Sequence, residues 1–154
     1  MKDIDTYRPG NFVVLENSSD HPRIVKVTQI EYTDNVITSL QINGSTWISK
    51  KEIKPVSLFI DCLFDLKFYI SSTIRRNEAG DLIKVDCQED IYHYYNGSLE
   101  LKVHKYDNTI WYENRQIHYI HQLQNLCSDV TGESFILSDL YENHFNKTFF
   151  EFQS

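Results

Sequence analysis

The chain has 154 residues, a length that suits one compact domain or a small module joined to a modest α+β unit. Its 41% hydrophobic and 14% aromatic residues exclude a disordered chain, and its longest apolar run, VSLFIDCLF, is too short for a membrane helix. The net charge of −7 argues against generic DNA or RNA binding, because an acidic surface repels phosphate groups. With no signal-peptide pattern at the N-terminus, we expect a cytoplasmic protein.

The charge is unevenly distributed along the sequence. Residues 1–56 contain seven basic and seven acidic residues, whereas residues 57–154 contain eight basic and fifteen acidic ones. An acidic second part suits a protein partner with a basic groove. The simpler interpretation, that acidity only favours solubility, stays open.

Residues 1–56 combine short apolar runs with turn signals. Asp34-Asn35 and Asn43-Gly44 are typical of hairpin turns, and the alternation of polar and apolar residues slips near Val25, which indicates a β-bulge. Four or five strands at a spacing of about ten residues predict a small antiparallel β-barrel of the Src-homology-3 type.

Residues 57–118 predict a short helix followed by an antiparallel β-meander. Ser57 is a candidate N-cap for a helix within SLFIDCLFDLKF. Gly80, Asn96-Gly97 and Asp107-Asn108 mark turns, and Leu99 to His104 alternate between apolar and polar residues. We therefore expect an α+β protein with a barrel over residues 1–56 and an acidic α+β unit over residues 57–154, sharing one core.

The stretch YIHQLQNLCSDVTGESF, residues 119–135, predicts the one strong helix. Its apolar stripe ends before Gly132, which stands where a helix C-cap belongs, and the stripe consists of Ile120, Leu123, Cys127 and Val130. We expect this stripe to pack and the amide-rich opposite face to remain available. The candidate partner-binding residues are Glu89, Asp90, Gln122, Gln124, Asn125 and Asp129.

No pattern in the chain predicts catalysis. His121 and Cys127 lie on opposite sides of a helix with roughly 100° per residue, which argues against a shared metal ion, and burial of Cys127 disfavours its thiolate. The five glycines form no phosphate-binding loop. We predict no catalytic residue, no metal and no cofactor.

An alternative interpretation places binding on the barrel. Lys50, Lys51 and Lys54 form a basic cluster beside Trp47, and barrels of this kind bind peptides, nucleic acids or other ligands along an open aromatic face. Direct nucleic acid binding is disfavoured by the overall charge but stays an alternative.

Two segments resemble known sequences. YRPGNFVVLENSSDHPRIVKVTQIEYTDNVITSLQINGSTWISKKEIKPVSL and IHYIHQLQNLCSDVTGESF, in that order, are similar to small, mostly uncharacterised proteins of Bacteroidetes genomes, prophages and mobile elements. The match in the second segment includes Tyr119, His121, Gln122, Leu123, Gln124 and Asn125. The resemblance implies a non-enzymatic phage or mobile-element accessory protein, and with the acidity it favours an anti-CRISPR-like inhibitor of a CRISPR effector or other host defence nuclease.

Overall fold

The chain forms two compact units in a computed structural model that describes residues 3–16, 23–60, 63, 66–70, 74–76, 78–84 and 91–132. The first unit comprises Met1–Leu58 and Tyr119–Ser154, and the second comprises Phe59–His118. This division differs from the predicted boundary at residue 56, because helix α1 (Ile120–Thr131) groups with the N-terminal strands.

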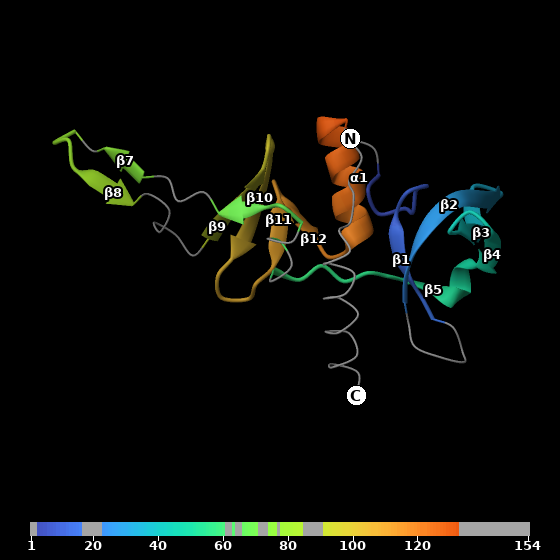
Figure 1. Cartoon of the computed structure of the whole chain (residues 1–154). Coiled ribbons are helices and arrows are strands. Elements are labelled where there is room, and N and C mark those ends of the chain that lie inside the picture. Colours follow the sequence, from blue (N-terminus) through green and yellow to red (C-terminus); the bar gives the residue numbers. More distant parts are fainter. Residues whose placement is uncertain are drawn as a thin grey trace. The chain divides into compact units, whose positions relative to one another are not determined.

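The first unit contains one five-stranded antiparallel sheet of order β4-β3-β2-β1-β5 (Figure 1). Both predicted hairpin turns are present, and Asp34 and Asn35 both take positive φ angles, of 52° and 65°, as a two-residue turn between strands requires. The predicted bulge lies slightly later than expected, between Val27 and Gln29. The elements are β1 (Phe12–Leu15), β2 (Arg23–Thr33), β3 (Val36–Ile42), β4 (Thr46–Ser49), the 3₁₀ turn η1 (Lys50–Glu52) and β5 (Ile53–Pro55).

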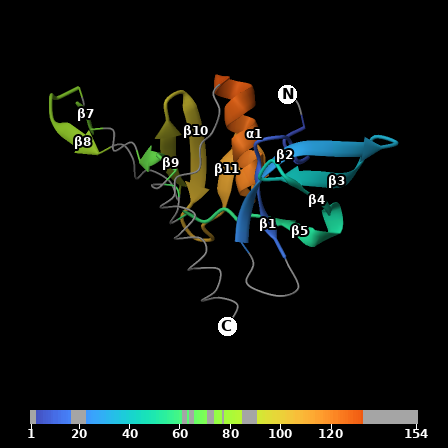
Figure 2. The same cartoon turned by 45° about the vertical axis from the view of Figure 1, so that its right-hand side comes forward.

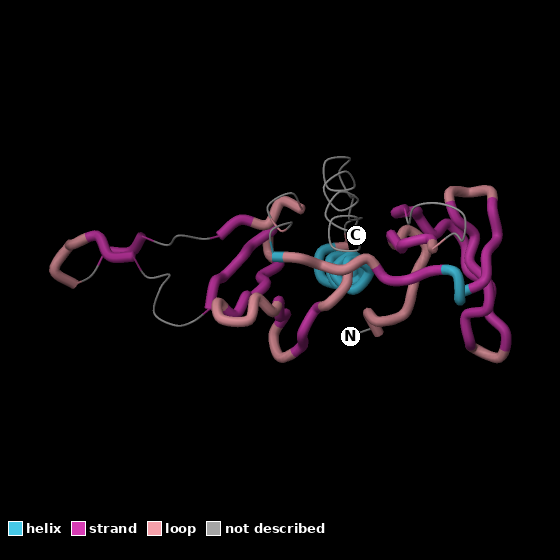
Figure 3. Tube along the Cα trace, turned by 90° about the horizontal axis from the view of Figure 1, so that it is seen from below, coloured by secondary structure: helices cyan, strands magenta, loops and turns pink. Residues whose placement is uncertain are grey.

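This sheet is curled. Strands β4 and β5 are its two edges, yet only the three residues of η1 separate them in sequence. In a flat sheet these edges would lie about 19 Å apart, at about 4.8 Å per neighbouring strand, whereas a three-residue 3₁₀ turn advances only about 6 Å. The tube view shows the strands of this unit bent round instead of lying in one plane (Figure 3). No closing ladder joins β4 to β5 among the described residues, so a closed barrel is not established.

The concave side of the curled sheet holds an aliphatic core. Alternate residues of the strands point to it, as the period of two along a strand dictates. Partly buried Tyr7, Ile30, Ile37 and Ile48 pack against this core. Its buried members are Val13, Leu15, Val25, Val27, Leu40, Ile42 and Ile53.

Helix α1 lies beside β1 within the first unit (Figures 1 and 2). Ile120, Leu123 and Cys127 are buried as predicted, but Val130 is exposed. Gly132 ends the helix with a φ of 73°, and its N–H donates to the Ser128 carbonyl, which confirms the predicted C-cap. Among the described residues, no helix is long and apolar enough to cross a membrane.

The second unit is built on the predicted meander. Its main sheet has the order β12-β11-β10-β9-β6, and a separate two-stranded hairpin joins β7 to β8. The predicted helix does not begin at Ser57, because that residue, which still belongs to the first unit, forms an isolated β-bridge with Tyr119 of the same unit. Residues 61, 62, 64 and 65 lie outside the described part. The strands are β6 (Tyr69–Ile70), β7 (Ile74–Arg76), β8 (Leu82–Lys84), β9 (Ile91–Asn96), β10 (Leu99–His104), β11 (Ile110–Tyr112) and β12 (Arg115–Ile117).

Candidate functional site

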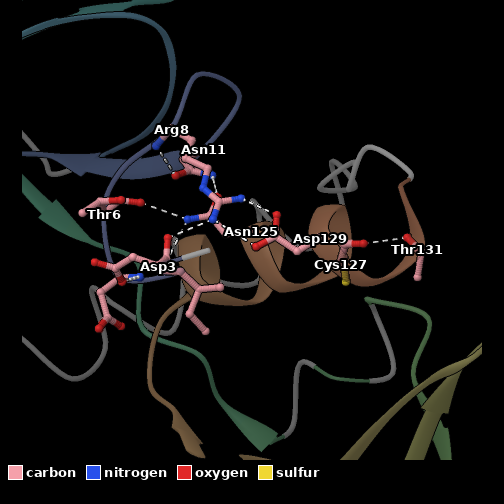
Figure 4. A network of polar contacts seen from close by, with 10 residues as sticks. Asp3, Thr6, Arg8, Asn11, Asn125, Cys127, Asp129 and Thr131 are labelled. Carbon is pink, nitrogen blue, oxygen red and sulfur yellow. Dashed lines mark hydrogen bonds and ion pairs between the residues drawn. The ribbon is translucent and has the colours of Figure 1, made fainter. Parts of the chain in front are cut away.

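The polar face of α1 binds the segment of its own chain that precedes β1. Asn125 illustrates the arrangement: its Nδ2 donates to the carbonyl oxygens of Ile4 and Thr6, at 3.0 and 2.9 Å. Its Oδ1 accepts from Asn11 Nδ2 at 2.9 Å. Figure 4 shows these side chains pointing toward one another across the two segments. A side-chain amide suits this position because it donates and accepts at once.

The two glutamines extend the same pattern. Gln124 accepts from the Phe12 N–H at 2.8 Å through Oε1, and it donates to the Gly10 carbonyl at 3.1 Å through Nε2. Gln122 donates from Nε2 to the Asp5 carboxylate at 2.6 Å. Its Oε1 accepts from the Tyr119 N–H at 3.1 Å and so caps the start of α1.

An ion pair closes the far end of this network. The two terminal nitrogens of Arg8 donate to the two carboxylate oxygens of Asp129, at 2.8 and 3.1 Å. Arg8 Nη2 also donates to the Asp3 carbonyl at 2.8 Å. We name the contacts of Gln122, Gln124, Asn125 and Asp129 with residues 3–12 the amide clamp. Because the helix amides donate to the backbone carbonyls of Ile4, Thr6 and Gly10, the clamp fixes the path of the chain as well as the side chains of this segment.

The expectation that the amide face of α1 remains available is therefore wrong. Gln122, Gln124 and Asn125 are 6%, 5% and 2% exposed, and Asp129 is partly buried beside Arg8. Amphipathic periodicity separates apolar from polar residues but does not reveal that a distant part of the chain covers the polar ones. Glu89 and Asp90, the other two candidate partner-binding residues, lie outside the described residues.

A pocket of about 400 Å³ opens where the clamp meets the curled sheet. The segment before β1 contributes Asp5, Thr6 and Tyr7, while the start of α1 contributes Tyr119, His121 and Gln122. The sheet contributes the remaining wall through Ile37 of β3, Lys50 of η1 and Pro55 of β5.

Aromatic rings surround His121 in this pocket. The centroid of the Tyr7 ring lies 4.7 Å from that of the imidazole, and the two ring planes are tilted by 52°. The Tyr119 ring stacks on the imidazole with a centroid distance of 5.8 Å and an interplanar angle of 13°. Burial, and to a smaller extent Tyr119, raise the pKa of Tyr7 to about 12. Tyr7 is therefore a neutral phenol at physiological pH.

His121 is a neutral imidazole with one nitrogen engaged. Its Nε2 donates to the Asp5 carbonyl oxygen at 2.8 Å. Burial lowers the pKa of His121, although the hydrogen bond to Asp5 and the charge of Asp5 oppose the shift. An imidazole in this state offers Nδ1 as a hydrogen-bond acceptor.

Cys127 is unsuited to nucleophilic chemistry. Burial raises the pKa of its thiol to about 12, so almost none of it is thiolate at neutral pH. No group of three or more His, Cys, Asp or Glu residues that would hold a metal ion occurs in the described part of the chain.

The residues of the predicted basic face, Trp47, Lys50, Lys51 and Lys54, have different surroundings in the structure. Lys50 lines the pocket, whereas Lys54 forms an ion pair with Glu16 at 2.8 Å. Lys51 follows Lys50 in η1 and does not line the pocket, and Trp47 of β4 is 46% exposed and pairs with Gln41. Of the residues that line the pocket, the sequence analysis named Lys50 and Gln122 as candidate binding residues. It assigned no binding role to the other lining residues, such as Asp5, Tyr7 and His121, which approach one another only through the fold.

The aromatic residues at positions 92–95 are divided between the two faces of strand β9. Tyr92 and Tyr94 oppose Val103 and Leu101 in the β9–β10 ladder and share the face of these buried residues. His93 and Tyr95 point to the other face, where His93 Nδ1 lies 2.6 Å from the Glu100 carboxylate. The alternation of a strand thus separates neighbouring aromatic residues.

No protein-family model, curated protein or solved structure matches the chain.

Replacing Gln124 with alanine should lower the free energy of unfolding by about 1–3 kcal/mol, because the Phe12 N–H and the Gly10 carbonyl lose their partner. Gln29→Ala, on exposed β2 surface, is the control and should stay within about 0.5 kcal/mol of the parent. Urea unfolding of the three proteins measures both values. Equal stability of Gln124→Ala and the parent would show that this amide does not hold the N-terminal segment.

Stability should rise with pH around the titration of His121. The folded pKa lies below the unfolded value of about 6.5, so the unfolded state binds more protons between the two and stability is lost as pH falls through this window. In urea unfolding between about pH 7.5 and 5, the parent should lose more stability than His121→Gln, which has no titrating ring. Parallel pH profiles would contradict a buried neutral imidazole.

Proposed function

We propose that the chain is a non-enzymatic binding protein and that the pocket of the first unit is where it holds a protein partner. The observation that carries this proposal is the aromatic pocket around His121, whose wall also includes a lysine. Aromatic residues dominate the energetics of protein interfaces because they bury large areas with few rotatable bonds. The amide clamp supports this role by fixing the backbone of the segment that carries Tyr7 against the helix that carries His121, which lowers the entropic cost of binding.

The chemistry of the pocket favours binding over catalysis. Among the described residues, His121 is neutral and its Nε2 is engaged with a backbone carbonyl, and the buried Cys127 thiol resists ionisation. A general base or nucleophile would need an accessible, correctly charged group next to a substrate. The features that remain, aromatic and aliphatic surface next to a lysine and polar side chains, suit a recognition site.

We also propose that the curled sheet of the first unit is a small β-barrel module of the Src-homology-3 kind. The support is the short η1 connection between its two edge strands, which forces the edges toward each other. Barrels of this kind commonly bind along a surface next to their loops. Here η1 contributes Lys50 to the pocket. The barrel alternative in which Trp47, Lys51 and Lys54 also contact the ligand is weaker, because Lys54 is paired with Glu16.

For the partner, we propose a protein of the host cell, in the narrowest form a CRISPR effector or other defence nuclease with a basic groove. The support is the net charge of −7 and the sequence resemblance to mobile-element proteins. The acidic excess belongs to both units: residues 59–118 carry seven basic and ten acidic residues, and residues 119–154 carry one and five. A basic partner surface would therefore meet favourable charge from either unit.

The charge reversal Lys50→Glu should abolish capture of the partner, because it removes the lysine of the pocket wall and so the contact that this cation makes with the partner. Lys51→Glu changes the net charge equally at the next residue of η1, outside the pocket, and should leave capture unchanged. The measurement is affinity purification from bacterial extract with quantitative mass spectrometry. A protein lost from Lys50→Glu and retained by Lys51→Glu supports the pocket as the site.

The proposal would be contradicted if Lys50→Glu and Lys51→Glu captured the same set of proteins, because the pocket would then make no specific contribution to binding. The identity of the protein whose capture requires Lys50 tests the narrower proposal, that the partner is a host defence nuclease. A defence nuclease supports inhibition of host defence, and an unrelated protein overturns it.

A further inference from the structure

His121 has an unpaired nitrogen at the pocket. Because Nε2 donates to the Asp5 carbonyl, Nδ1 of the neutral ring carries a lone pair and can only accept a hydrogen bond. Nδ1 is buried and has no protein partner in the described part of the chain. Such an acceptor is unfavourable in a protein interior unless another molecule supplies a donor. The imidazole, 4% exposed, lines the pocket through which that donor would enter.

The side chains around His121 limit which kind of ligand can carry the hydrogen-bond donor. Tyr7 and Tyr119 both contact the imidazole with their rings, and Ile37 and Pro55 add aliphatic surface to the same pocket. A flat aromatic group fits such a wall by offset or edge-to-face contacts. Because Nδ1 is buried, a donor reaches it only when neighbouring side chains move, and the Tyr7 and Tyr119 rings, which contact the imidazole, should then be perturbed by binding.

The charge in the pocket comes from Lys50. No ion pair joins Lys50 to a carboxylate among the described residues. Asp5, the acidic residue of the pocket wall, accepts a 2.6 Å hydrogen bond from Gln122. An anionic group on the ligand would therefore meet a lysine that the described part of the protein does not neutralise.

We propose that the pocket binds a tryptophan side chain of the partner with a carboxylate next to it. The indole packs against Tyr7 and Tyr119, its N–H donates to His121 Nδ1, and the carboxylate pairs with Lys50. An indole N–H donates only, which matches an acceptor that cannot donate, whereas a phenylalanine ring offers no N–H. The inference rests on the proposed function, since it names the group that the pocket takes from the partner.

The probe is N-acetyl-L-tryptophan, which carries both the indole and a carboxylate. It is titrated into the full-length protein while NMR follows the ¹⁵N resonances of the His121 ring and the ring protons of Tyr7 and Tyr119. We expect saturable shifts at all three residues. N-acetyl-L-phenylalanine, which lacks the indole N–H, and N-acetyl-L-tryptophanamide, which lacks the carboxylate, should each bind roughly tenfold more weakly.

The variant Lys50→Gln tests the contact of Lys50 with the ligand carboxylate separately from the contacts of the indole ring. It should lower the affinity for N-acetyl-L-tryptophan to that of the amide and leave the affinity for the amide unchanged, while Lys51→Gln should match the parent for both. Absence of saturable shifts at His121, or equal affinity for the tryptophan and phenylalanine compounds, would overturn the proposal.

The outcomes separate this inference from the proposed function. If the probe fails to bind while Lys50→Glu still abolishes capture of a protein partner, the tryptophan inference is overturned and the binding site stands. If the probe binds as expected while capture is independent of Lys50, the ligand chemistry is supported and the protein-binding function is overturned.

Discussion

The amide clamp between α1 and residues 3–12 is the constraint on which the first unit depends. Its hydrogen bonds join groups more than 110 positions apart, such as Asn11 and Asn125, and they satisfy backbone carbonyls that would otherwise be buried without partners. The chain leaves the first unit after Leu58, forms the second unit, and returns to the first unit at Tyr119. The clamp therefore determines both where the N-terminal segment runs and which face of α1 is covered.

The pocket follows from the same constraint. Asp5 and Tyr7 belong to a segment without regular secondary structure, and the clamp holds that segment against the start of α1. The curl of the sheet then brings η1 and β5 to the other side. The pocket is assembled from three sequence-distant pieces, and hydrogen bonds fix the backbone of one wall while the β-sheet fixes the other. Preorganisation of the backbone supports the recognition role that we propose for this pocket.

Local signals in the sequence predict much of the fold, and the long-range contacts account for the rest. The turns at Asp34-Asn35, Asn43-Gly44 and Asn96-Gly97 and the helix end at Gly132 depend on a few neighbouring residues, and they are confirmed. The burial of Gln122, Gln124 and Asn125 was not predicted, because it depends on a segment near the N-terminus. One signal was present: a solvated helix face usually carries lysine and glutamate, whereas this one carries uncharged amides, which can both donate and accept when buried.

The most direct test of the clamp is a double-mutant cycle on Asn11 and Asn125, whose side chains share a 2.9 Å hydrogen bond. The free energy of unfolding is measured for the parent, Asn11→Ala, Asn125→Ala and the double variant. The account predicts a coupling energy of about 0.5–3 kcal/mol, because each single substitution removes the same interaction. Additive effects of the two substitutions would contradict it, since α1 and the N-terminal segment would then be stabilised independently.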